Sequence, residues 1–143
     1  MGYQHTQKVP GKLLTAATLA GFAIGLTPPG ILLRIATWGT LGAVAATFRS
    51  LTVEVDDSQV KVQFGEGLIK RSFPLKEISS ADKVKTTPLQ GWGVRWVVGG
   101  WLYNIYGLDA VELHFNDGKR ALIGTDDPDN LLAAINEQLS HAS

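Results

Sequence analysis

The hydrophobic positions of the chain follow two different patterns, one on each side of Arg49. Residues 13–33 carry no charged side chain, and after Arg34 residues 35–48 carry none either. An uncharged run of this length is typical of membrane-spanning helices. It also lacks the polar positions, spaced 3.6 residues apart, that form the solvent-exposed face of a helix in a soluble protein. The first part of the chain is therefore expected to lie in a membrane.

The apolar segment is interrupted by Thr-Pro-Pro-Gly at residues 27–30. Two prolines and a glycine cannot continue a helix, because each proline lacks an N–H donor and restricts the residue before it. We predict a two-helix transmembrane hairpin over residues 1–49, with helices at about residues 11–26 and 31–48. Two alternatives remain open: a cleaved signal peptide, and a single spanning helix over residues 13–33. In the second, residues 35–48 lie flat or pack on a partner.

Basic residues near the predicted helix ends indicate the orientation of the hairpin. Lys8, Lys12 and Arg49 flank its outer ends, and Arg34 alone is near the turn. The excess of bases places both termini in the cytoplasm. Arg34 and Arg49 are then expected at the membrane interface, where a long side chain reaches the headgroups.

Small residues recur at four-residue spacing in both predicted helices, as Gly21 with Gly25 and Gly39 with Ala43. Such faces let helix backbones approach closely in lipid. We expect these small-residue faces to pack the two helices of the hairpin against each other or against another protein.

After Arg49 the apolar period changes to two, which is typical of strands with one buried face. Asp117-Gly118 indicates a tight hairpin, and residues 91–107 predict two strands joined by Gly-Gly. A final helix begins near Pro128, where Asp127 and Asp129 suit its first turn. About seven antiparallel strands closed by a C-terminal helix predict a small barrel over residues 50–143. The predicted strands cover residues 51–55, 60–64, 68–75, 79–84, 110–115 and 120–124, in addition to the 91–107 hairpin.

Composition changes this picture in one respect. The 143-residue chain is formally neutral, with 13 basic and 13 acidic residues. The first 49 residues hold four of the bases and no acid, so the remainder carries an excess of four acids. This balance, without a Lys/Arg stripe, makes a nucleic-acid partner unexpected. The absence of cysteine excludes disulfides, thiolate metal sites and a Cys nucleophile.

Several segments resemble the small bacterial pleckstrin-homology-like membrane proteins, in which a membrane hairpin precedes a PH-like barrel. The resemblance implies the same fold, a cytoplasmic PH-like domain and attachment to the bacterial inner membrane; it implies no catalytic activity. The segments that carry it are Gly91-Trp-Gly-Val-Arg95, Gly100-Trp-Leu-Tyr-Asn104, Gly107, Ala110-Val-Glu-Leu113, Asp117-Gly-Lys119 and Ile123-Gly-Thr-Asp-Asp-Pro128.

The titratable residues do not predict an enzyme. The three histidines lie far apart in the sequence, so no nucleophile and base are paired. Helix capping accounts for the acids near Asp127 without a metal, and the glycines of residues 91–100 are not a phosphate loop. No catalytic residue, cofactor or metal ligand is assigned. Lys70, Arg71, Lys83 and Lys85 are assigned to a solvated sheet face.

An interaction role is the prediction that remains. Trp92, Arg95, Trp96, Trp101 and Tyr103 combine the residue types that anchor protein interfaces. We therefore expect a non-enzymatic, membrane-anchored module that serves as an accessory or assembly subunit of a bacterial membrane protein complex. The alternative is a peripheral lipid-binding module at the inner membrane surface. A homo-oligomer is left open.

Overall fold

The computed structural model describes residues 2–13, 15–16, 19, 30–87 and 93–142. Within them the chain forms nine strands, the helices α2 (Ile31–Thr47) and α3 (Pro128–Ala142), and one short 3-10 turn, η1 (Leu75–Glu77). The described residues 11–13, 15–16 and 19 are also helical. The strands are β1 (Tyr3–Lys8), β2 (Ser50–Val55), β3 (Gln59–Phe64), β4 (Ile69–Pro74), β5 (Ile78–Lys85), β6 (Gly93–Val97), β7 (Gly100–Asn104), β8 (Asp109–Phe115) and β9 (Arg120–Gly124).

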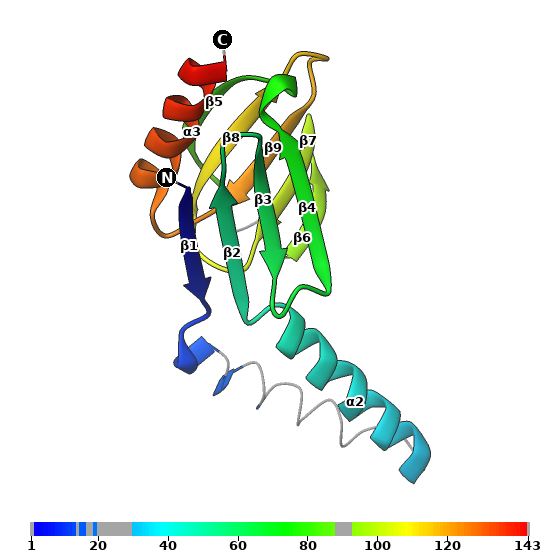
Figure 1. Cartoon of the computed structure of the whole chain (residues 1–143). Helices are drawn as coiled ribbons and strands as arrows, with labels where there is room; N and C mark the ends of the chain where they lie inside the picture. The colour runs from blue at the N-terminus through cyan, green and yellow to red at the C-terminus, as the bar shows by residue number, and fades with distance from the viewer. Residues whose placement is uncertain (1, 14, 17–18, 20–29, 88–92, 143) are drawn as a thin grey trace.

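The strands form two separate sheets. The first has four antiparallel strands in the order β1-β2-β3-β4, and the second has five in the order β5-β8-β9-β7-β6. All pairs in the second sheet are antiparallel except β7 and β9, which run parallel. Figure 1 shows the two sheets as layers facing each other, with α3 along the side of β5. The link from one sheet to the other is η1, which follows Pro74 at the end of β4.

The core lies between the two sheets, and strict alternation places it there. In β2 and β3 every second residue is buried, and Val53 stands directly opposite Val62. The second sheet contributes Val111, Leu113 and Ile123 from β8 and β9. Helix α3 closes one side with Leu131 and Ile135. Each strand therefore buries the face that its apolar residues share.

The individual strands after Arg49 and the C-terminal helix confirm the elements that the alternation predicts. The arrangement of these strands differs from the predicted one. The prediction of a mainly β protein with membrane helices and one antiparallel barrel of about seven strands is wrong, because the strands form two sheets that are not joined into a single one. Two features explain the difference: Pro74 and η1 end the ladder after β4, and β7 pairs in parallel with β9. Alternation along one strand carries no information about either.

The predicted transmembrane hairpin is also wrong. Among the helices of the described segments, none is both long enough and apolar enough to cross a membrane. The helix predicted at residues 31–48 is present as α2. Most of the helix predicted at residues 11–26, including Gly21 and Gly25, lies outside the described residues.

The first residues of the chain form strand β1 at the edge of the first sheet. They pair with β2 over six positions, from Tyr3 opposite Val55 to Lys8 opposite Ser50. The sequence pattern missed this strand because its inward positions are Tyr3, His5 and Gln7 rather than aliphatic residues. Gln7 is nevertheless buried, and its side-chain amide donates a hydrogen bond to the carbonyl oxygen of Tyr106.

Candidate functional site

Helix α2 is a long apolar surface that the rest of the described chain does not cover. None of its 17 residues is buried. Figure 1 shows it extending away from the lower end of the two sheets. Its large exposed side chains are Ile31, Leu32, Leu33, Ile35 and Val44. A contiguous apolar surface of this kind on a folded protein usually marks an interaction site.

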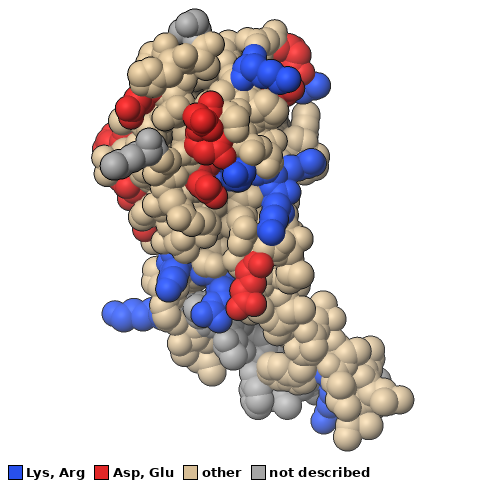
Figure 2. All heavy atoms as spheres, in the orientation of Figure 1, with Lys and Arg blue, Asp and Glu red and all other residues tan. Residues whose placement is uncertain are grey.

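The threonine hydroxyls of α2 have hydrogen-bond partners within the helix itself. The hydroxyls of Thr37, Thr40 and Thr47 each donate to the carbonyl oxygen four residues earlier, at 2.8 to 2.9 Å. Arg34 is the only charged residue of the helix, and it lies in the first turn. Figure 2 accordingly shows the protruding helix as almost uniformly uncharged. Apart from its first turn, α2 presents apolar groups around its whole circumference.

Gly39, Gly42 and Ala43 are among the small residues of this helix. A Cβ placed on Gly39 or Gly42 meets no atom within 4 Å. Contacts within the described chain therefore do not explain either glycine. A helix with a small-residue stripe allows another helix to approach its backbone closely.

The end of α2 is fixed to the sheets by aromatic packing. Phe48 follows the helix, and its ring meets that of Phe64 edge to face, with centroids 5.4 Å apart. Gly65, which follows β3, lies against the last turn of α2, where a Cβ would stand 2.8 Å from the carbonyl oxygen of Thr47. Arg49 lies directly after this junction, and its carbonyl oxygen accepts a hydrogen bond from the amide of Val9. The interface roles predicted for Arg34 and Arg49 stay predictions.

The structure brings three of the five predicted interaction residues together. Trp96 and Trp101 stand opposite each other in the β6–β7 hairpin, and their rings meet edge to face at 5.4 Å. Tyr103 shares their face but is buried. Arg95 pairs with Leu102 on the opposite face, and Trp92 lies outside the described residues. Trp96 is 63% exposed and Trp101 42% exposed, so the pair forms an open aromatic surface.

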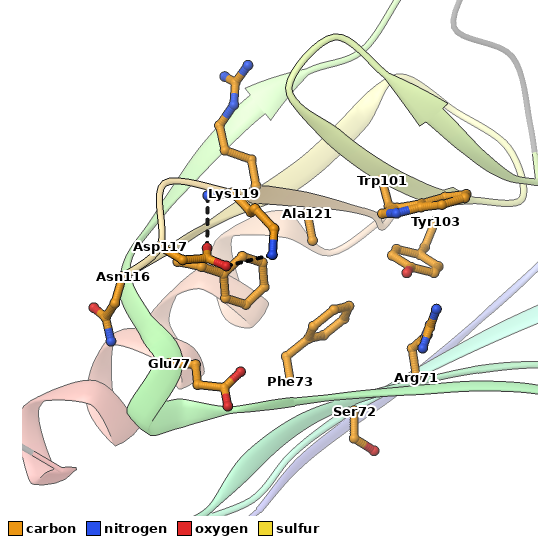
Figure 3. Close-up of a pocket in the computed structure, with 12 residues that line it drawn as sticks. Arg71, Ser72, Phe73, Glu77, Trp101, Tyr103, Asn116, Asp117, Lys119 and Ala121 are labelled. Carbon is orange, nitrogen blue, oxygen red and sulfur yellow. Dashed lines mark hydrogen bonds and ion pairs between the residues drawn. The ribbon is translucent and has the colours of Figure 1, made fainter.

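A cleft of about 500 Å³ opens beside this pair, between β4 and the strands β7 and β9. Its floor consists of Phe73, Tyr103, Phe115 and Ala121. Phe73 is central: its ring lies 5.8 Å from that of Tyr103 and 5.6 Å from that of Phe115. Figure 3 shows the cleft with Phe73 between the two sheets and Trp101 at one end.

Charged side chains line the rim of the cleft. Lys119 Nζ lies 2.8 Å from Asp117 Oδ2, and the hydrogen bond from Lys119 holds the pKa of the Asp117 carboxyl below its usual range. Arg120 Nη1 lies 3.0 Å from Glu112 Oε1, and its Nη2 donates to the carbonyl oxygen of Val98. Both of these cations are therefore engaged by groups of the protein itself.

Arg71 differs from these two cations in its position. It pairs in register with Val62, between Ile69 opposite Phe64 and Phe73 opposite Val60. Val60, Val62 and Phe64 are all fully buried, so Arg71 shares the inward side of β4 by register, although its own side chain is exposed. Figure 3 shows its side chain pointing into the cleft on the same side as Phe73, while Ser72 points away. Within the described ranges, no carboxylate lies within ion-pair distance of Arg71.

The histidines are placed in structural contacts. His5 Nε2 lies 2.5 Å from Asp126 Oδ1, and His114 Nε2 lies 3.2 Å from Asp82 and 3.3 Å from Glu112. No group of three potential metal ligands gathers among the residues that the structure describes. The absence of enzyme activity stays a prediction.

Neither the models of known protein families nor the curated proteins contain a match to this chain. The resemblance to the bacterial PH-like membrane proteins therefore stays a prediction. What α2 and the cleft beside Trp101 can bind follows from their own geometry.

Two cleft residues, Arg71 and Phe73, were not predicted as site residues. Arg71 was assigned to a solvated sheet face, and it is exposed, but the cleft that it lines was not predicted. The signal that identifies them is the alternation of Ile69, Arg71 and Phe73, which continues the inward pattern of the preceding hairpin. The alternation shows that these residues share one face of β4. It does not show that a cleft separates this face from the second sheet.

Proposed function

We propose that this protein is a non-enzymatic interaction module that acts as an accessory or assembly subunit of a membrane protein complex and docks on it through α2. The observation that supports the proposal most directly is a 17-residue apolar helix with no buried residue. Each Ile or Leu side chain that a partner covers contributes about 1.5–3 kcal/mol of apolar burial.

The chemistry of α2 favours a protein partner with an apolar helical surface. An amphipathic helix that lies flat on a bilayer needs a strongly polar face, and α2 has none. An all-round apolar helix is instead stable when it is enclosed. The open space at Gly39 and Gly42 suits a helix of the partner, and small-residue contacts of this kind are common in membrane protein bundles.

Site-specific photocrosslinking in cells tests this proposal. A photoreactive amino acid at Ile35, which is 63% exposed, should give crosslinks to helices of one membrane protein partner. The same group at Leu68, an exposed residue in the β3–β4 turn, is the matched control and should not. Ile35→Glu should abolish co-purification of that partner, and Leu68→Glu should leave it unchanged. Equal crosslinking or equal loss at both positions would refute docking through α2.

A second candidate function, peripheral lipid binding, is favoured by the tip of the β6–β7 hairpin. Val98 at this tip is 92% exposed, next to the exposed pair Trp96 and Trp101. Trp side chains suit the headgroup layer of a bilayer. The full chain should then float with anionic vesicles at low salt, and Trp96→Ala with Val98→Ser should prevent it. Flotation that survives both substitutions contradicts a role for this hairpin.

A further inference from the structure

We propose that the cleft between β4 and β7–β9 is a binding site for a small aromatic monocarboxylate. The aromatic body lies over Phe73, and the carboxylate pairs with Arg71. This site is separate from α2, so the proposal does not depend on the function proposed above.

The floor of the cleft suits a flat apolar group. Phe73, Tyr103 and Phe115 present ring faces and edges to one open cleft, and the ring of Phe73 lies 5.6 to 5.8 Å from the other two rings. Aromatic rings prefer such edge-to-face and offset contacts with one another. A volume of about 500 Å³ lies within the range of small-molecule sites, and accommodates a fused two-ring system.

Arg71 supplies the anion-binding group. Its register position opposite Val62 sets an exposed guanidinium beside the aromatic floor, at the open side of the cleft. The neighbouring Lys119 and Arg120 already pair with Asp117 and Glu112. Arg71 is the cleft cation for which the described chain provides no carboxylate. A carboxylate accepts two parallel hydrogen bonds from guanidinium, and such charge-assisted bonds are among the strongest in proteins.

The opposite end of the cleft argues for a single negative charge. Glu77 points into the cleft beyond Phe73, and Asp117 lies at the same end (Figure 3). A second carboxylate on the far side of the ligand would approach these acids and be repelled. The cleft therefore distinguishes a monocarboxylate from a linear dicarboxylate of the same ring system.

Three matched probes test the ligand class on the full-length protein. They are 2-naphthoate, its neutral analogue 2-naphthalenemethanol, and 2,6-naphthalenedicarboxylate. The readout is the indole N–H signal of Trp101 in a two-dimensional ¹H–¹⁵N spectrum, assigned by its loss in Trp101→Phe. The chain has four tryptophans, so the other indole signals report non-specific binding. We expect 2-naphthoate to shift the Trp101 signal at a concentration about tenfold lower than either analogue.

Substitutions in β4 separate recognition by Arg71 from general attraction to positive charge. Arg71→Gln should weaken 2-naphthoate binding about tenfold and leave the neutral analogue unchanged. Lys70→Gln is the matched control, because it removes the same charge from the adjacent residue on the other face of the strand. It should leave both affinities unchanged. Arg71→Lys retains the charge but lacks the two parallel N–H donors of guanidinium, so its affinity for 2-naphthoate should be intermediate.

Three results would overturn the proposal: no shift of the Trp101 signal by 2-naphthoate, equal affinity for 2-naphthalenemethanol, or equal weakening by Lys70→Gln and Arg71→Gln. None of them bears on docking through α2, since the substitutions lie in β4. Spectra of both variants that retain the dispersed signals of the parent establish that the fold is intact.

Discussion

The imidazole of His5 lies 2.5 Å from the carboxylate of Asp126, and this contact joins the first strand to the segment just before the last helix. The two residues are 121 positions apart. Tyr3 makes a similar contact: its hydroxyl donates a hydrogen bond to Asp127 Oδ2 at 3.1 Å. Strand β1 is thus held at its outer edge by side chains as well as by its ladder to β2.

We predict a small favourable coupling between His5 and Asp126. A double-mutant cycle with His5→Ala and Asp126→Ala, followed by urea unfolding at pH 7, should give about 0.2–1 kcal/mol. The value is small because both side chains are about one-third or more exposed, so solvent screens the contact. Additive effects of the two substitutions would show that the pair does not hold β1.

Tyr3→Phe should lower the free energy of unfolding by about 0.5–1.5 kcal/mol at pH 8, because the hydrogen bond to Asp127 is lost. Burial and, after it, the nearby Asp127 carboxylate raise the pKa of the Tyr3 phenol above its ordinary value. The folded protein thus favours the neutral phenol.

That pKa shift determines the pH dependence. A group with a raised folded-state pKa contributes its stability below its unfolded pKa, near 10 for tyrosine, and loses it as the pH rises further. The difference in unfolding free energy between the parent and Tyr3→Phe should therefore shrink above pH 10. A difference that stays constant from pH 8 to pH 11 would contradict the assigned contact.

Gly100→Ala should destabilise the protein by at least about 2–3 kcal/mol. A Cβ at this position overlaps the carbonyl oxygen of Arg120, because β7 and β9 are in close parallel register there. Neither backbone can shift without disturbing the ladder. Gly42→Ala is the control, since its Cβ faces open space and alanine favours a helix. Thermal unfolding measures both, and equal melting temperatures would refute the parallel β7–β9 register.

Gly39 offers a test of how closely a partner approaches α2. Gly39→Leu should leave the melting temperature within a few degrees of the parent, because the Cβ position is open. It should nevertheless reduce partner recovery in the co-purification described above, since a bulky side chain prevents close helix contact. Gly39→Ala should retain the partner. Full recovery with Gly39→Leu would mean that the docked face lies elsewhere on the helix.

The local elements could be predicted well from the sequence, for a clear physical reason. In β2 and β3 every inward position is aliphatic or aromatic, so the two-residue period is unmistakable. Helix α3 shows an apolar stripe through Leu131 and Ile135 that only a helix places on one face. Strand β1 lacks such a signal. Its inward Tyr3, His5 and Gln7 are polar, and their partners are distant in the sequence.

The candidate site was predictable only in part. The β6–β7 segment was identified from its aromatic residues, and Trp101 and Tyr103 do line the cleft. The opposite wall was missed, because Arg71 and Phe73 lie on a strand of the other sheet. At α2 the uncharged run predicts a segment that is enclosed by apolar groups, but it does not tell whether lipid or protein would enclose it.

Apart from β1, the sequence alone determined where the described chain forms its strands and which of their faces are apolar, and it located α2 and α3, because those properties depend on neighbours a few residues apart. Tertiary structure decided how the strands divide into two sheets, that β7 lies parallel to β9, and that β1 joins the first sheet. It also decided that the exposed Arg71 lines a cleft together with residues of the second sheet. These features arise from contacts between residues distant in the chain, which no local pattern encodes.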